Sequence, residues 1–170
     1  MKNRFRLAVA GAAVLAAFLA LNTLSARAEH FDIILRVNSG EKQAQSSMDS
    51  TPPIGGVNPR PVLKVKAGDQ IKVDWRVKNS SPHGTLRNVT THFFIVRQAK
   101  TGQKPVPDPA GNAGIFDTSV TTDLKLGAIA TGVVKIRISD PGSYLVRLQS
   151  EGTHDEAGHE HFSAIDVEVQ

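Results

Sequence analysis

The sequence predicts an all-β protein built as a single antiparallel β-sandwich of seven to nine strands. Short apolar segments recur at even spacing, turns that contain Gly or Pro separate them, and none has the apolar repeat of an amphipathic helix. The clearest segment is 71–78, where Ile, Val, Trp and Val alternate with Lys, Asp, Arg and Lys. A period of two with one apolar face is typical of an antiparallel strand that packs on a core.

The first 28 residues have the pattern of an export signal, which we expect to be cleaved. Lys2, Arg4 and Arg6 precede an apolar run of about 15 residues, shorter than the roughly 20 that a bilayer span needs. The Ala-Arg-Ala at 26–28 is a small-x-small cleavage site. We therefore predict a signal peptide at 1–28, a periplasmic or extracellular protein, and no stable membrane anchor after cleavage.

Charge and cysteine content narrow the classes of partner and cofactor. Four of the 20 Lys and Arg residues and none of the 16 Asp and Glu residues lie in the signal peptide, so 16 of each sign remain in the mature chain. A basic surface for nucleic acid is therefore not predicted, and the expected partner is an unknown protein or envelope component. The chain has no Cys, so neither a disulfide nor a thiolate ligand is available.

Residues 29–61 are expected to hold a first strand followed by a long Pro-, Gly- and Ser-rich loop. The segment 31–37 is short, apolar and rich in β-branched residues, whereas 38–61 has no periodicity and contains Pro-Pro, Gly-Gly and Asn-Pro pairs. This loop would either separate a mobile N-terminal arm from the domain or connect two strands of one sandwich. We count 29–170 as one domain, with 62–170 as its core.

The remaining strands are expected within 62–170, and each is bounded by turn residues. We place them at 62–66, 71–78, 88–98, 115–120, 133–138, 143–148 and 162–169, with 124–129 as a short edge strand or a loop. Phe93 to Val96 is apolar on both faces, which indicates a central strand, and Trp75 is expected to anchor the core. The final hairpin is expected to bury Tyr144, Val146, Leu148, Ile165, Val167 and Val169.

Two stretches carry a resemblance to known folds. At AGDQIKVDWRVKN (67–79) and DPGSYLVRLQ (140–149) the chain resembles immunoglobulin-like and cupredoxin-like sandwiches, in which such turns open core strands. The whole chain is also similar to uncharacterised exported proteins of planctomycete bacteria, a resemblance that implies no activity. The cupredoxin resemblance implies the fold alone, because a type 1 copper site needs a Cys thiolate and the chain has none.

The loop of the final hairpin concentrates the candidate chemistry. His159 and His161 are two residues apart, so they point to the same side of an extended segment and are able to share one ion. Imidazole suits copper or zinc. His154 is a further candidate ligand, and His92 would join if folding brings it to the same end of the sandwich. Neighbouring carboxylates are available as a fourth or supporting ligand, namely Asp155, Glu156 and Glu160.

An ordinary polar turn explains the same loop, and a half-buried structural histidine explains His92. No nucleophile elbow, phosphate-binding loop or opposed carboxylate pair marks the chain as an enzyme. We therefore predict no catalytic residue and no certain cofactor. The predicted function is that of an exported, non-enzymatic module with a binding or structural role. The alternative is a periplasmic metal-binding protein that holds copper or zinc at His154, His159, His161 and His92.

Overall fold

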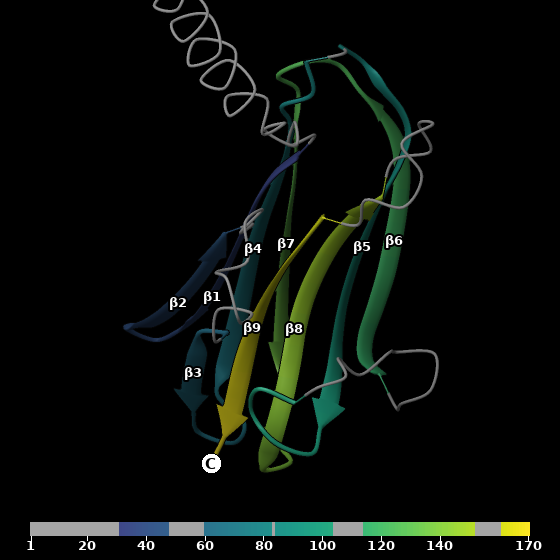
Figure 1. The fold of residues 1–170 in the computed structure, drawn as a ribbon. Helices are drawn as coiled ribbons and strands as arrows, with labels where there is room; N and C mark the ends of the chain where they lie inside the picture. Colours follow the sequence, from purple (N-terminus) through teal and green to yellow (C-terminus); the bar gives the residue numbers. More distant parts are fainter. Residues whose placement is uncertain (1–30, 48–59, 83, 104–113, 152–160) are drawn as a thin grey trace, which may run out of the picture.

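A computed structural model describes residues 31–47, 60–82, 84–103, 114–151 and 161–170 (Figure 1). These residues form nine strands and no helix. The strands are β1 (Phe31–Ser39), β2 (Lys42–Ser47), β3 (Val62–Val65), β4 (Gln70–Asn79), β5 (Leu86–Gln98), β6 (Gly114–Leu124), β7 (Ile129–Arg137), β8 (Gly142–Glu151) and β9 (His161–Val169). Within the described ranges, no helix is long and apolar enough to cross a membrane.

The strands form two sheets that pack face to face. The first has the order β2-β1-β4-β7 and the second the order β3-β9-β8-β5-β6. Every neighbouring pair is antiparallel except β3 and β9, which run parallel. Strands β1 and β2 of the first sheet pack on β9, β3 and β8 of the second. The predicted all-β antiparallel sandwich is therefore confirmed, with nine described strands.

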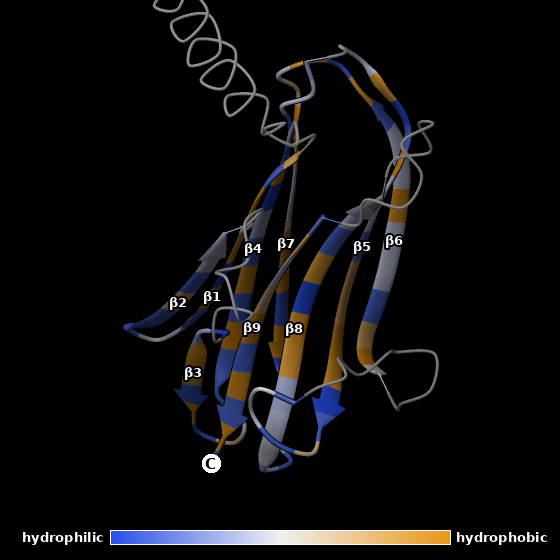
Figure 2. Cartoon of the chain, viewed as in Figure 1, coloured by the Kyte–Doolittle hydropathy of each residue, from blue (hydrophilic) through white to orange (hydrophobic). Residues whose placement is uncertain are grey.

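Alternating apolar residues fill the space between the sheets, as the period of two predicts. Along β1, every second side chain from Phe31 to Val37 is buried. The six core residues predicted for the final hairpin are all buried in the same cluster. Figure 2 shows the alternation as orange and blue bands along β8. The predicted hairpin is therefore confirmed, and it supplies the middle of the second sheet.

Strand β5 is buried on both of its faces, which confirms the prediction of a central strand. It lies between β8 and β6. Phe93 and Ile95 belong to the main core, whereas Phe94 and Val96 form a smaller apolar cluster with Leu145 and Ala164 on the outer face of the sheet. The four consecutive apolar residues of β5 are therefore buried alternately in the main core and in the outer cluster.

The segment after the first strand differs from its prediction. Residues Lys42–Ser47, expected to belong to a loop, form strand β2. Its sequence KQAQSS buries only Ala44, so it lacks the apolar alternation that identifies a strand. Backbone pairing with β1 forms it instead. Strand β1 lies between β2 and β4 in the first sheet, so it is an integral strand of the sandwich.

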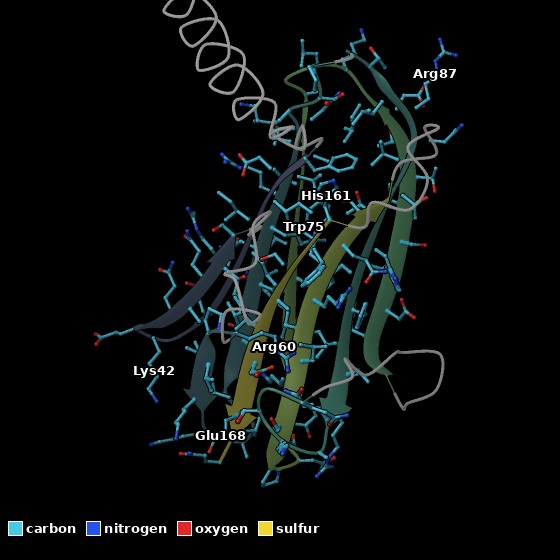
Figure 3. The ribbon with its side chains drawn as sticks, in the orientation of Figure 1. Lys42, Arg60, Trp75, Arg87, His161 and Glu168 are labelled. Carbon is cyan, nitrogen blue, oxygen red and sulfur yellow. The ribbon has the colours of Figure 1, made fainter. Side chains whose placement is uncertain are left out.

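A buried ionic cluster links the residue before β3 to β9 and to the end of β5 within the second sheet. Asp166 on β9 is 1% exposed, and the Nε atom of Arg60, just before β3, lies 2.8 Å from its Oδ1 atom. The same carboxylate accepts hydrogen bonds from Gln98 Nε2 at 2.9 Å and from the backbone N–H of Gly102 at 2.6 Å. Figure 3 shows Arg60 well away from His161, which begins β9. The cluster therefore fixes the β3 side of the molecule.

Candidate functional site

The predicted metal ligands fall into two groups. His154 and His159 lie outside the described residues, as do Asp155, Glu156 and Glu160. His161, expected in the loop, is the first residue of β9. It pairs with Ser150, which is fully buried, and its ring meets Phe31 edge-on with centroids 5.3 Å apart. The His161 side chain is therefore directed between the two sheets.

His92 lies on the outer face of the second sheet. In register it stands beside Gln149 of β8, which in turn stands beside Phe162 of β9. The His92 Nε2 atom lies 2.6 Å from Asp117 Oδ1 on β6, and the His92 ring lies against that of Phe94 with centroids 5.0 Å apart. A carboxylate that holds one ring nitrogen fixes the orientation of the imidazole, as in many metal sites.

The fold brings His92 to the end of the sandwich where β8 ends, as the metal hypothesis requires, but it separates His92 from His161. Strand β8 ends at Glu151, which pairs with Thr90, so the loop that follows starts two residues from His92 in register. His92 faces outward and His161 faces inward, with β8 between their strands. These two rings therefore lie on opposite faces of one sheet. In the described part of the chain, no three His, Asp or Glu residues are grouped so as to hold a metal ion.

The side chains next to His92 on the outer face of the second sheet contact one another. The guanidinium carbon of Arg147 lies 4.3 Å from the ring centroid of Phe162, and Arg147 Nε donates a hydrogen bond to Gln149 Oε1 at 2.9 Å. Stacking of a guanidinium on an aromatic ring is a favourable cation–π contact. These groups therefore bind one another and contribute to the rigidity of the sheet.

A second feature lies at the edge of the sandwich formed by β6, β7 and the turn 125–128 between them, which we call the open edge. Strand β6 pairs only with β5, and β7 pairs only with β4, among the described strands. The main contacts of each strand are with that one neighbour. Figure 1 shows β6 apart from β7 at the right-hand side of the molecule. Each strand therefore has one backbone edge without a described strand beside it.

The inward positions in the middle of β6 are exposed. Thr118, Val120 and Thr122 stand opposite Phe93, Thr91 and Val89, which are all buried, so they belong to the inner face of the sheet. Val120 is nevertheless 58% exposed, and both threonines are exposed as well. Phe116, whose ring centroid lies 5.6 Å from that of Phe93, and Leu124 at the end of the strand both pack on the core. The first sheet therefore does not extend over the middle of the inner face of β6.

The facing strand of the first sheet is partly exposed in the same way. The inward residues of β7 are half-buried, and they pack on the margin of the core together with Trp75: Ala130, Val134 and Ile136. Gly132 stands opposite Trp75, and a Cβ atom at Gly132 would lie 2.2 Å from the indole Cε2 atom. The absence of a side chain at Gly132 therefore lets the indole lie across β7 at the margin of the core.

The strands and turn of the open edge carry most of the exposed large apolar residues that the structure describes. The described chain exposes seven large apolar residues, and five of them lie between Ile115 and Val133: Ile115, Val120, Leu126, Ile129 and Val133. A strand edge without a neighbour is a surface onto which another polypeptide is able to add a strand, and exposed apolar side chains on that strand favour the contact. Backbone hydrogen bonds provide affinity in this mode, and apolar side chains provide contact area.

Sequence reasoning missed the open edge, although a signal for it exists. The strand predicted at 115–120 continues to Leu124. Before that leucine its inward positions hold two large apolar residues, Phe116 and Val120, and two threonines. A strand whose inward positions are threonine has no need of apolar cover. The isolated Gly132 within the apolar run of β7 is a second signal, because glycine inside a strand marks a close approach by another group.

Comparison with known proteins identifies a general likeness of fold. No family model matches the chain, and no curated protein matches it. The resemblance to planctomycete proteins therefore stays a prediction. Among solved structures, the C-terminal domain of Wzt is 10% identical with a TM-score of 0.41, and the alignment covers 80% of this chain and 70% of that one.

Two further solved structures show the same level of likeness. The soluble domain of PmoD from Methylocystis sp. ATCC 49242 (Rockwell) is 12% identical with a TM-score of 0.41 and covers 82% of this chain and 92% of that one. A family 123 glycoside hydrolase from Clostridium perfringens is 12% identical with a TM-score of 0.38 over 65% of this chain and 23% of its own. At these values the likenesses carry no inference about function.

Proposed function

We propose that the chain is an exported, non-enzymatic β-sandwich module, immunoglobulin-like or cupredoxin-like in kind, that binds a polypeptide strand at its open edge. The observation that carries this proposal is that five of the seven exposed large apolar residues of the described chain lie on β6, β7 and the turn between them, whose outer strand edges have no described neighbour. A strand edge binds another chain through backbone hydrogen bonds, and the apolar side chains add buried contact area. Neither kind of contact supplies a nucleophile or a proton donor for catalysis. The signal peptide at 1–28 supports action in the periplasm or outside the cell.

Site-specific photocrosslinking in the native host tests the proposal. A benzophenone amino acid would replace Val133, which is 57% exposed at the open edge, or Val62, which is 46% exposed on β3 at the other side. We expect a crosslinked product of discrete mass from position 133 only, and we expect the exchange Val120→Lys to abolish it. Equal products from both positions, or none from position 133, would contradict the proposal.

Metal binding is a second candidate function, and one observation favours it. Asp117 holds the His92 ring at the same end of the sandwich as the loop that contains His154 and His159. The hypothesis concerns copper or zinc, with imidazole and carboxylate ligands. Because His161 faces the interior, we expect His92 to act with His154 and His159, and His161 to contribute less.

Thermal denaturation with added metal tests this second candidate. Ligand binding to the folded state raises stability by about 2.7 kcal/mol at 100 times the Kd. We expect copper or zinc to raise the Tm of the parent chain, and we expect His92→Ala or His159→Ala to remove the rise. His161→Ala serves as the comparison, because its effect should be smaller. An unchanged Tm with both metals would rule this site out.

A further inference from the structure

The two strands of the open edge carry opposite charges. Strand β6 contains Asp117 and Asp123 and no basic residue, whereas β7 contains Lys135 and Arg137 and no acidic residue. Asp123 accepts a hydrogen bond from the backbone N–H of Asn88, and Arg137 donates one to the carbonyl of Gly68, so both interact with uncharged groups. Within the described residues, neither Lys135 nor Arg137 forms a salt bridge. Asp117 contacts His92 Nε2 through its Oδ1 atom at 2.6 Å, and a carboxylate has a second oxygen that is able to accept from another donor. Each strand therefore presents charge that the other would complement.

The directions of the two strands also fit one another. Strand β6 runs toward the turn at 125–128, and β7 runs away from it in Figure 1. A two-fold axis parallel to the strands therefore places β7 of one molecule antiparallel to β6 of a second, and the same contact forms twice. A symmetric pair of this kind is the commonest form of protein oligomer.

We propose that the polypeptide bound at the open edge is a second copy of this chain, paired through β7 of each molecule and β6 of the other. This inference rests on the proposed function and names its partner. A register that pairs residues 130–137 of β7 with residues 117–124 of β6 places Val134 opposite Val120 of the second copy on the inner face. The same register places Arg137 opposite Asp117 on the outer face, with Lys135 diagonal to that carboxylate. Opposite charges at these distances stabilise a strand pair.

The other symmetric arrangements are less favourable. If β6 pairs with β6 about Val120, Asp117 stands opposite Asp123 twice, and like charges directly opposite destabilise a sheet. A β7 pair leaves the carboxylates of β6 without a basic partner. Pairing of unlike strands also places the half-buried Val134 and Ile136 beside the exposed Val120, so it covers apolar area from both molecules.

Disulfide trapping tests this arrangement directly, because the chain has no Cys of its own. The Cα atoms of residues directly opposite in an antiparallel pair are about 4.5–5.5 Å apart, within the range that a disulfide spans. We would prepare Val120→Cys and Val134→Cys as separate exported chains, mix them and oxidise them mildly. We expect a linked dimer in the mixture at several times the amount seen with either variant alone. A mixture of Val62→Cys with Val134→Cys is the matched control and should give no such excess.

Each other outcome overturns a defined part of the inference. A dimer that Val120→Cys forms alone as readily as in the mixture would show that β6 pairs with β6. No linked dimer, together with a monomer mass by light scattering at high concentration, would overturn self-association. If either cysteine variant fails to fold, we would compare Val120→Lys with Val62→Lys by light scattering. Only Val120→Lys should reduce the mass in solution from that of a dimer to that of a monomer. A photocrosslinked product from position 133 that differs from twice the chain mass would overturn the second copy and leave the proposed function intact.

Discussion

The two edges of this sandwich are built in opposite ways. At the edge formed by β2 and β3, which we call the closed edge, the sheets contact one another, and Lys42 on β2 donates a hydrogen bond to the carbonyl of Lys64 on β3 at 3.0 Å. Lysine at an edge strand discourages another chain from pairing there. The open edge has no lysine on β6 and exposes valine on both strands. The comparison shows that the edge strand β2 carries a lysine and the edge strand β6 does not, which is the difference that the proposed partner would use.

The largest expected effect comes from the cluster that fixes the closed edge. Arg60→Ala would leave the carboxylate of Asp166 buried without its ion-pair partner. We expect a loss of about 3–5 kcal/mol in the free energy of unfolding, because an unpaired buried charge is costly. Urea denaturation measures the loss. Lys64→Ala, which removes an exposed pair with Glu168, is the control and should cost under about 1 kcal/mol. Equal losses would show that Asp166 is not the source of the stability.

A smaller loss is expected where Trp75 lies across β7 at the open edge. Gly132→Ala forces the indole to move, because the added Cβ atom overlaps it. We expect a cost of about 1–3 kcal/mol, typical of overpacking, and a red shift in fluorescence as the ring becomes more exposed. Trp75 is the only tryptophan, so the emission reports on this ring alone. Thr131→Ala, on the outer face of β7, should change neither quantity. An unshifted spectrum would mean that the core margin adapts without moving the ring.

A lysine introduced at either edge tests self-association separately from the stability of the single molecule. Val120→Lys and Val62→Lys both change an exposed side chain, so each should alter the stability of the single molecule by no more than about 0.5 kcal/mol. Self-association makes the Tm rise with protein concentration by mass action. We expect Val62→Lys to retain this dependence and Val120→Lys to lose it, as measured by calorimetry over a range of concentrations. A Tm of the parent chain that is independent of concentration would contradict self-association.

The smallest effect concerns pH at the closed edge. A hydrogen bond from Gln170, and then the contact with Lys64, lower the pKa of Glu168 below its ordinary value. A carboxyl whose pKa is lower in the folded state adds stability above the ordinary pKa of glutamate, about 4.3, and loses it as pH falls through the lowered value. We expect the Tm difference between the parent and Glu168→Gln to be greatest near neutral pH. It should vanish in acid, and a constant difference from pH 7 to pH 2 would contradict the assignment.

Much of the fold followed from the sequence because alternation determines which face of a strand turns inward. The strand around Phe93 and the hairpin around Tyr144 and Ile165 were predicted on this basis and are confirmed. Strand β2 was missed because backbone pairing forms it, and its side chains give no signal apart from Ala44. The loop alternative for 124–129 holds for the turn between β6 and β7.

The site was harder to predict, for a different physical reason. Alternation says that Val120 points inward, but whether another sheet covers it depends on how far the first sheet extends. Likewise, the spacing of His159 and His161 says that they share a side of an extended segment, but not which side. Pairing with the buried Ser150 determines that His161 faces the interior. The roles of His154 and His159 in metal binding stay predictions.

The order of the strands along the chain lets the two edges form at different times when the chain folds from its N-terminus. Strands β6 and β7 pair with β5 and β4, which precede them, so the open edge is complete before the last strand emerges. The closed edge has to wait for β9, because β3 pairs with β9 and Arg60 binds Asp166 far along the chain. Contacts between residues so distant in sequence form slowly. If the proposed self-association holds, chains that fold at high concentration meet with their open edges formed first, so the refolding yield should depend on protein concentration.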